Sequence, residues 1–365
     1  MNLLTSSRIR AAHACPRLDH YRYGLGLVAP STGAMAFGTA IHAGLEAWWA
    51  TIRDGLPGDA LDAALAVLDC QPLADPYDLA RAEAMLVAYD VRWQRWACSV
   101  EVLAIEAEFR APLCHPDGRA ARTWSLAGKL DALVRLSDGR VAIVEHKTTS
   151  RDAGAGTEYR ARLTLDPQVS VYHDGAAALG YAADLCLYDV LVKPSQKPLT
   201  ATPDEDRVYT QPKSRACKAC RKAPGVHTED GITCAEGRIV TDPGGRLRAG
   251  QRVADETPEE YRARLIEAIA ADPDRYMIHA EIVRTERDRA EHGADVWETV
   301  HAIEHHRRRL PVLPPRHASA CFAHGSPCAF LPLCEGRGRV EDYARGGAHA
   351  ELTTMTTQTR EDHAA

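Results

Sequence analysis

The stretch GKLDALVRLSDGRVAIVEHKTTS, residues 128–150, carries the clearest structural signal in this 365-residue chain. Alternating apolar and polar residues precede Ser137, Asp138 and Gly139, a combination typical of the tight turn in a β-hairpin. After the turn, residues 141–144 (VAIV) form a continuous apolar run, which is typical of a buried strand. The stretch therefore predicts a hairpin whose second arm lies inside a sheet.

Three charged side chains of this hairpin form a candidate catalytic centre. Side chains alternate along a strand, so Glu145 and Lys147 share a face, and hairpin pairing brings Asp131 beside Glu145. Two neighbouring carboxylates repel each other unless a cation lies between them, and their oxygens suit Mg²⁺ or Mn²⁺. A metal ion lowers the pKa of bound water, while a neighbouring ammonium group orients that water or stabilises developing charge. The alternative is an exposed polar face of a hairpin, which fits poorly with the apolar run before Glu145.

Helices and strands flank the hairpin on both sides. A helix over 34–53 carries an apolar stripe around His42. Asp166 and Pro167 begin a helix over 167–180, with aspartate as N-cap and proline at the first position. The sequence also predicts helices over 77–98, 257–271 and 286–309, and strands over 101–110, 124–136, 140–147, 184–192 and 276–284.

The hairpin sequence resembles the catalytic hairpin of the RecB-like branch of the PD-(D/E)XK nuclease superfamily. Other elements of that branch occur in the same order along the chain. They are a helical histidine (His42), an acidic residue on the preceding strand (Glu106 or Glu108), and a Gln-x-x-x-Tyr helix after the lysine (Gln168 and Tyr172). Glu106 is preferred to Glu108, because the family pattern places an aromatic residue three positions later, here Phe109.

The resemblance implies an α/β fold: a restriction-endonuclease-like core with a small mixed β-sheet flanked by helices. It implies a divalent-metal-dependent DNA nuclease that hydrolyses phosphodiester bonds, with Asp131, Glu145 and Lys147 as the catalytic residues. The implied ligands of Mg²⁺ or Mn²⁺ are His42, Glu106, Asp131, Glu145 and the backbone carbonyl of residue 146. Gln168 and Tyr172 are implied to position the DNA strand, and the alternative for Tyr172 is a core residue.

Four of the eleven cysteines resemble the ligands of iron–sulfur nucleases, the AddB-type exonucleases and the cluster-bearing CRISPR-adaptation nucleases. They are Cys15 near one end of the chain and Cys321, Cys328 and Cys334 near the other, spaced C-x6-C-x5-C. The resemblance implies that a [4Fe–4S] cluster cross-links the helical N- and C-terminal segments and has a structural role. Those families have a tighter first pair, C-x2-C, so zinc remains an alternative, as do four unrelated thiols.

A second group of cysteines lies in a polar segment rich in glycine and proline. The pattern C-x2-C-x6-His-x6-C predicts a zinc site formed by Cys217, Cys220, His227 and Cys234, and the alternative is a flexible insert. The remaining cysteines in apolar or strand contexts are predicted to be packing residues: Cys70, Cys98, Cys114 and Cys186.

The expected substrate is DNA, and the favoured mode is exonuclease action on single strands or ends. The alternatives are an endonuclease of the same fold, such as a nicking or restriction-like enzyme, and a catalytically silent nucleic-acid-binding subunit. A helicase or recombination partner in DNA repair is a further expectation. The chain has no GxxxxGK[ST] motif, so it is not expected to contain an ATP-driven motor.

Composition limits the class of protein and its location. Hydrophobic residues make up 45% and charged residues 26%, which is ordinary for a soluble globular protein. The formal net charge of −6 argues against a protein that coats nucleic acid non-specifically, although local basic patches still steer DNA. No run of apolar residues is long enough to span a membrane, and no secretory signal is evident, so the cytoplasm is the expected location.

The domain organisation expected from these patterns has five parts. They are an N-terminal helical region over 1–100 with the first cluster cysteine and His42, a nuclease core over 101–194, a cysteine-containing surface insert over 195–256, a strand, helices and the three-cysteine segment over 257–342, and a disordered tail over 343–365.

Overall fold

The computed structural model describes most of the chain and divides it into two compact units. It describes residues 2–29, 32–208, 247–323, 327–347, 349 and 352, and the backbone alone of four short strands. One unit comprises Met1–Ser195 with Leu265–Ala365, and the other comprises Gln196–Arg264. In the described part of the chain, no helix has the length and apolar character needed to cross a membrane.

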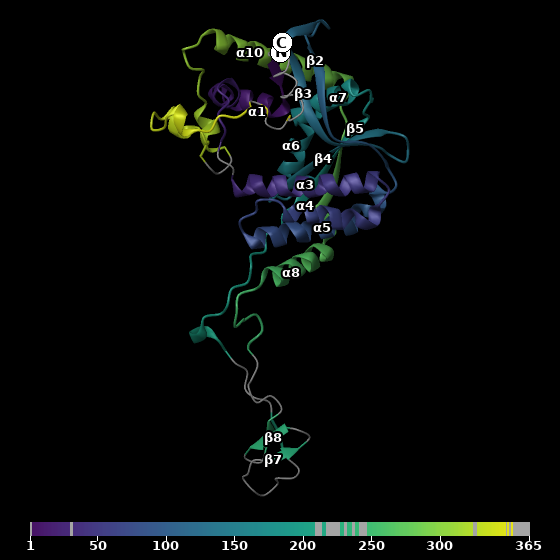
Figure 1. The fold of residues 1–365 in the computed structure, drawn as a ribbon, viewed down its shortest axis with the longest axis vertical. Helices are drawn as coiled ribbons and strands as arrows, with labels where there is room; N and C mark the ends of the chain where they lie inside the picture. Colours follow the sequence, from purple (N-terminus) through teal and green to yellow (C-terminus); the bar gives the residue numbers. More distant parts are fainter. Residues whose placement is uncertain are drawn as a thin grey trace. The chain divides into compact units, whose positions relative to one another are not determined.

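The first unit is built on a mixed sheet, which confirms the predicted core architecture (Figure 1). The strands follow the order β1-β3-β4-β5-β10, and β2 pairs with β3 outside this path. β3 and β4 are antiparallel, β4 and β5 are parallel, and β10 runs antiparallel to β5. The bounds are β1 Asn2–Leu4, β2 Glu101–Cys114, β3 Ala120–Arg135, β4 Val141–Thr149, β5 Leu185–Val192 and β10 Met277–Ile282.

The predicted hairpin is formed by β3 and β4. Its turn closes with a hydrogen bond from the backbone N–H of Leu136 to the carbonyl of Arg140 (2.8 Å), and Gly139 adopts a positive φ of 89°. Such a backbone conformation favours glycine. Ala132 lies opposite Val144 in the register, so the next step along each strand places Asp131 beside Glu145.

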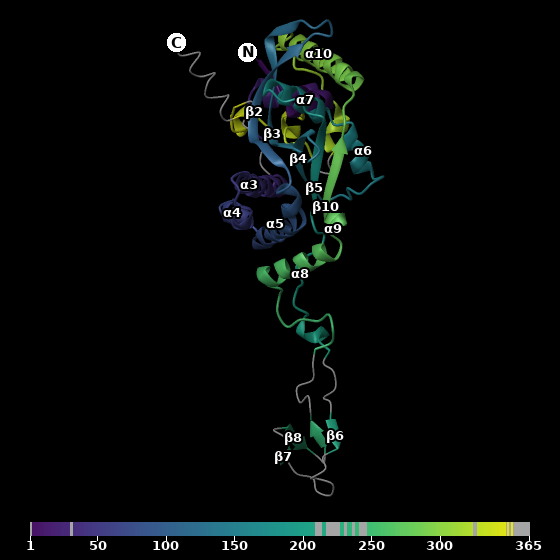
Figure 2. The same ribbon diagram turned by 90° about the vertical axis from the view of Figure 1, so that its right-hand side faces the viewer.

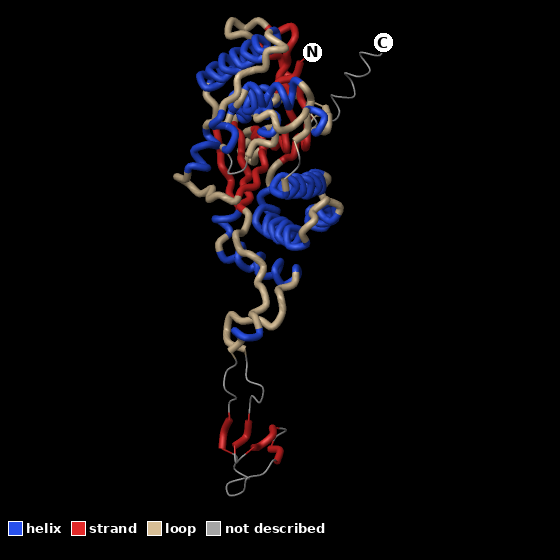
Figure 3. Tube along the Cα trace, turned by 90° about the vertical axis from the view of Figure 1, so that its left-hand side faces the viewer, coloured by secondary structure: helices blue, strands red, loops and turns tan. Residues whose placement is uncertain are grey.

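Helices pack against both faces of this sheet (Figures 2 and 3). α3, α4 and α5 lie side by side, while α7 contacts β2, β3 and β4, and α10 contacts α7 and β2. The long helices are α1 Ser6–Ala14, α3 Gly33–Arg53, α4 Ala60–Asp69, α5 Pro76–Ala97, α7 Pro167–Ala178, α8 Pro258–Ala271 and α10 Glu286–Arg308. The short ones are α2 Pro16–Asp19, α6 Glu158–Thr164, α9 Pro273–Tyr276 and α11 Leu331–Cys334.

Several features depart from the expectations. β1, α4 and α6 were not expected, and β2 and β3 extend further toward their shared turn than predicted. Residues 343–347, expected to belong to a disordered tail, pair with the segment after Gly24. The backbone N–H of Val28 donates to the carbonyl of Ala344 (2.9 Å), and that of Gly346 donates to the carbonyl of Gly26 (2.9 Å). Leu352 is also fully buried.

Among its described residues, the second unit has four short strands in the order β6-β9-β8-β7. They span Ser214–Ala216 (β6), His227–Glu229 (β7), Ile232–Ala235 (β8) and Arg238–Val240 (β9). His227 lies opposite Cys234 in the β7–β8 register. Cys217 and Cys220 lie outside the described residues, and only the backbone of His227 and Cys234 is described.

Candidate active site

The two hairpin carboxylates lie next to each other in the sheet, and each has a defined partner. Asp131 Oδ2 accepts a hydrogen bond from the backbone N–H of His146 (2.8 Å). Glu145 Oε1 accepts hydrogen bonds from Lys147 Nζ (2.5 Å) and from Gln168 Nε2 (2.7 Å). The structure therefore brings Asp131, Glu145 and Lys147 together; we call these three residues the carboxylate–lysine centre.

One oxygen of Glu145 lacks a partner although it is buried. The Glu145 side chain is only 3% exposed, and its Oε2 has no hydrogen-bond partner among the residues that the structure describes. Burial and the neighbouring Asp131 charge raise the pKa of Glu145 from 4.5 to about 7, against the opposing effect of Lys147. An unpartnered buried carboxylate oxygen next to a second carboxylate is the arrangement that a divalent cation would satisfy.

Asp131 stays ionised at neutral pH despite its burial. Burial alone would raise its pKa, but the contact with His42 and the nearby charges of His146 and Lys147 outweigh that effect and lower it. His42 Nδ1, from α3, lies 3.7 Å from Asp131 Oδ2. Burial disfavours the charged form of His42, yet Asp131 raises the pKa of the imidazole overall. Helix α3 thus places His42 beside Asp131.

The first turn of α7 orients the lysine. Asp166 caps this helix by accepting a hydrogen bond from the backbone N–H of Gln168 (3.0 Å). Gln168 Oε1 then accepts from Lys147 Nζ (2.9 Å), and Gln168 Nε2 donates to the hydroxyl of Tyr172 (2.6 Å). Gln168 and Tyr172, expected to position DNA, are both buried. Gln168 contacts Glu145 and Lys147, while Tyr172 contacts Gln168 and packs edge-on against Phe109, with ring centroids 6.0 Å apart. Their role in positioning DNA stays a prediction.

Glu106 adopts a strained backbone conformation. Its φ is +48°, the one positive value for a non-glycine residue in the described part of the chain. It lies between Ile105 and Ala107, which pair with Ala132 and Leu130, so it stands across from Asp131. Strain of this kind costs on the order of 1–3 kcal/mol and is concentrated at functional sites. Burial raises the pKa of the Glu106 carboxyl, and an ion pair with Lys129 counteracts that rise.

Lys129 also belongs to this neighbourhood, although the sequence pattern does not predict it as a site residue. It carries the ammonium group paired with Glu106, and its pKa is raised by Glu106 despite partial burial. A signal was present, since Lys129 and Asp131 are two residues apart on one strand and therefore share a face.

The four cysteines of the predicted cluster converge. Cys15 is buried after α1, while Cys321, Cys328 and Cys334 are partly exposed, and none forms a disulfide. Burial raises the pKa of the Cys328 thiol, and the three other thiols lie near enough to add to the rise. The backbone N–H of Cys328 donates to the carbonyl of Cys321 (2.7 Å), which holds these two cysteines close together. We call these four residues the four-thiol site.

Neither site is a closed cage for a single ion. Within the described ranges, no three imidazole, thiol or carboxylate groups enclose a position for one metal ion. A [4Fe–4S] cluster binds each thiolate to a different iron, so it does not require four thiols around one point. Of the cysteines expected to be packing residues, only Cys186 is buried; Cys70, Cys98 and Cys114 are exposed, which corrects that prediction.

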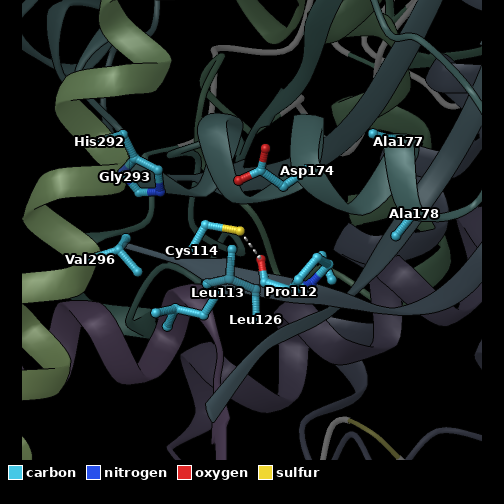
Figure 4. A pocket seen from close by; sticks show the side chains of 11 residues that line it. Pro112, Leu113, Cys114, Leu126, Asp174, Ala177, Ala178, His292, Gly293 and Val296 are labelled. Atoms are coloured by element: carbon cyan, nitrogen blue, oxygen red, sulfur yellow. Dashed lines mark hydrogen bonds between the residues drawn. The ribbon is translucent and has the colours of Figure 1, made fainter. Parts of the chain in front are cut away.

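A separate cavity of about 400 Å³ lies between β2, β3, α7 and α10 (Figure 4). Small side chains leave this space, and Cys114, Asp174 and His292 supply its polar lining. No residue of the carboxylate–lysine centre lines it. The cavity is therefore distinct from the candidate active site.

Comparison with known proteins identifies the family. The family model of the PD-(D/E)XK nuclease superfamily matches residues 3–335. No curated protein matches. Among seven matching chains of solved structures, one described as "Crystal structure of SSO0001" is 12% identical, covers 53% of this chain and 64% of that chain, and has a TM-score of 0.25. From the family match over nearly its whole length, the chain belongs to the PD-(D/E)XK nuclease superfamily.

Proposed function

We propose that this protein is a divalent-metal-dependent deoxyribonuclease that degrades DNA from single strands or ends. The observation that carries the proposal is the buried, unpartnered Oε2 of Glu145 beside the ionised Asp131. The residues present fit Mg²⁺ or Mn²⁺, because carboxylate oxygens dominate and imidazole is also accepted by Mn²⁺.

Asp131 and Glu145 would hold the ion, with His42, Glu106 and the backbone carbonyl of His146 as further ligands. When bound, the ion would lower the pKa of a water molecule and neutralise charge on the phosphate. Lys147 keeps its proton at neutral pH, because Glu145 raises its pKa above the ordinary value despite burial. It would therefore orient the attacking water, or stabilise the developing negative charge, as an ammonium donor and not as a base.

The preference for single strands or ends rests on the resemblance of this centre to the RecB-like branch. His42 before the hairpin and the Gln168–Tyr172 pair after it occur in the order of that branch. The complete and mutually bonded set of Glu145, Lys147 and Gln168 favours an active enzyme over a silent nucleic-acid-binding subunit. A helicase or recombination partner would supply the single strands.

A structural [4Fe–4S] cluster at the four-thiol site is part of the proposal. Convergence of Cys15 with the three C-terminal cysteines supports it, since a shared cofactor explains why thiols about 300 residues apart meet. Anaerobic purification with iron and zinc analysis and an absorption scan tests it. A sulfur-to-iron absorption band and four irons per chain are expected. One zinc ion per chain and no iron would mean that the four-thiol site binds zinc instead of a cluster.

The nuclease proposal is tested with purified protein and Mn²⁺ on linear single-stranded, linear duplex and closed circular DNA. Degradation of linear DNA with intact circles is expected. Cleavage of closed circles would establish an endonuclease instead. If the wild-type protein degrades neither DNA nor RNA, the protein is a binding subunit and the proposal fails.

A further inference from the structure

A buried polar cluster lies on the side of β4 opposite the catalytic side chains. Its centre is Asp189 of β5, which is fully buried. Asp189 Oδ2 accepts a hydrogen bond from the hydroxyl of Tyr89 (2.6 Å) and contacts His146 Nδ1 (3.0 Å). The other oxygen lies 3.5 Å from His279 Nε2. A buried carboxylate is costly unless it is paired, so these contacts are needed for the fold to tolerate it.

The partners of Asp189 are themselves held in place. Trp49 Nε1 of α3 donates to the Tyr89 hydroxyl (3.1 Å), and the ring of His279 stacks on Trp93 with centroids 3.6 Å apart. The cluster therefore joins α3, α5, β4, β5 and β10 around one carboxylate. Contacts from five elements hold these side chains together, although Asp189 Oδ1 and His279 Nε2 form no hydrogen bond within the described residues.

His146 connects this cluster to the carboxylate–lysine centre. It stands between Glu145 and Lys147, so its ring points away from their side chains. The ring contacts Asp189, while the backbone N–H of the same residue donates to Asp131 Oδ2 (2.8 Å). Fixing the ring thus fixes the peptide group that holds Asp131.

The cluster reaches the centre by a second route. Trp49 lies two helical turns after His42 on α3, so both side chains project from the same side of that helix. Trp49 is bonded to Tyr89 of the cluster, and His42 lies 3.7 Å from Asp131. The position of α3, and with it His42, is set partly by the contacts of Asp189.

We propose that Asp189 is a positioning residue for the metal ion, acting through the His146 ring and the peptide that holds Asp131. The inference rests on the proposed function, since it assumes that Asp131 and Glu145 bind a divalent cation. Partners in the second layer of a metal site typically change metal affinity by about 10- to 100-fold when they are removed.

Mn²⁺ binding, measured without DNA by calorimetry and by the electron paramagnetic resonance signal of free Mn²⁺, tests the inference. The variant Asp189→Asn preserves side-chain shape but removes the negative charge that holds both histidines. We expect its Mn²⁺ affinity to fall about 10- to 100-fold. In the nuclease assay the Mn²⁺ concentration for half-maximal rate should rise, while the rate at saturating Mn²⁺ changes much less.

Asp90→Asn is a matched control. Asp90 follows Tyr89 on α5 and accepts a hydrogen bond from the neighbouring tryptophan, Trp48 Nε1 (2.8 Å), but it has no contact with His146. A loss of stability alone should affect both variants, whereas only Asp189→Asn should lose Mn²⁺ affinity. If Asp189→Asn does not fold, Tyr89→Phe replaces it, and a severalfold loss of affinity is expected from deleting one bond to Asp189.

Two results would overturn the inference, and they differ from each other. A folded Asp189→Asn or Tyr89→Phe protein with wild-type Mn²⁺ affinity would show that the polar cluster around Asp189 stabilises the hydrophobic core but does not affect metal binding. Absence of Mn²⁺ binding that depends on Asp131 in the wild-type protein would refute the proposed function, and the inference would fall with it.

Discussion

The carboxylate–lysine centre and the four-thiol site differ in how completely the fold builds them. In the first, one hairpin and the first turns of α7 supply hydrogen-bonded side chains, and the ammonium group of Lys147 pairs with the Glu145 carboxylate. In the second, the thiols make only weak contacts, such as Cys15 Sγ accepting from the backbone N–H of His317 (3.4 Å). The sheet and α7 thus hold the carboxylate–lysine centre by side-chain hydrogen bonds, whereas the protein's own contacts hold the thiols of the four-thiol site only weakly.

The largest expected effect is a loss of nuclease activity, which should follow from changing the carboxylate–lysine centre. Asp131→Asn should reduce Mn²⁺-dependent DNA degradation to background, because the ion loses a ligand whose charge neither His42 nor Glu145 replaces. Asp138→Asn is the matched control, since Asp138 lies in the exposed turn of the same hairpin and bonds to Arg140. Substantial activity in Asp131→Asn, assayed on linear DNA, would remove Asp131 from the mechanism.

The stability of the protein, in contrast to its activity, should depend mainly on the four-thiol site. Cys328→Ser should lose iron and colour and lower the free energy of unfolding by about 2–5 kcal/mol, by analogy with removal of a cross-link that closes a long loop. Denaturant unfolding under anaerobic conditions measures the change. Cys98→Ser, at an exposed thiol elsewhere, controls for the substitution itself. Unchanged stability together with unchanged iron content would contradict the assignment of Cys328 as a ligand.

Features with a local sequence signal could be predicted, whereas features that depend on tertiary contacts could not. The hairpin and the start of α7 depend on local signals, namely strand alternation, a glycine turn and an Asp-Pro cap, and the structure contains both elements. The positive φ of Glu106 has no local signal, because a strand with glutamate at alternate positions looks regular. The Asp189 cluster also escaped prediction. It joins residues from distant elements, and only the tertiary arrangement of β4, β5 and α5 brings them together.

A pH titration of the metal-free protein sharpens the comparison further. The pKa of Glu145 rises from 4.5 to about 7 on folding, which corresponds to about 3 kcal/mol. A raised carboxyl pKa stabilises the fold fully below pH 4.5, and the contribution is lost as the pH rises through about 7. The raised pKa of His42 acts in the same direction. The free energy of unfolding in EDTA should therefore fall between pH 5 and pH 8.

Two additions test the origin of that pH dependence. Mn²⁺ should restore stability at pH 8, because it binds the ionised carboxylates of the folded state. Glu145→Gln should flatten the profile over the same range, whereas Cys328→Ser should leave its slope unchanged. A profile in Glu145→Gln as steep as that of the wild type would assign the dependence to another group.

The smallest effect comes from deleting a single hydroxyl near each site. Tyr172→Phe removes one of the two acceptors of Gln168 Nε2 and leaves Glu145 Oε1 as the other, which loosens the side chain that holds Lys147. The cost of one such bond, about 1 kcal/mol, predicts a drop in kcat of about 3- to 10-fold with little change in iron content. Tyr343→Phe is the counterpart beside the thiols, where the hydroxyl donates to the carbonyl of Ala329 (2.8 Å). It should leave kcat unchanged and speed the loss of iron to a chelator. Equal effects of both variants on kcat would mean that the two sites are coupled, although their described contacts are separate.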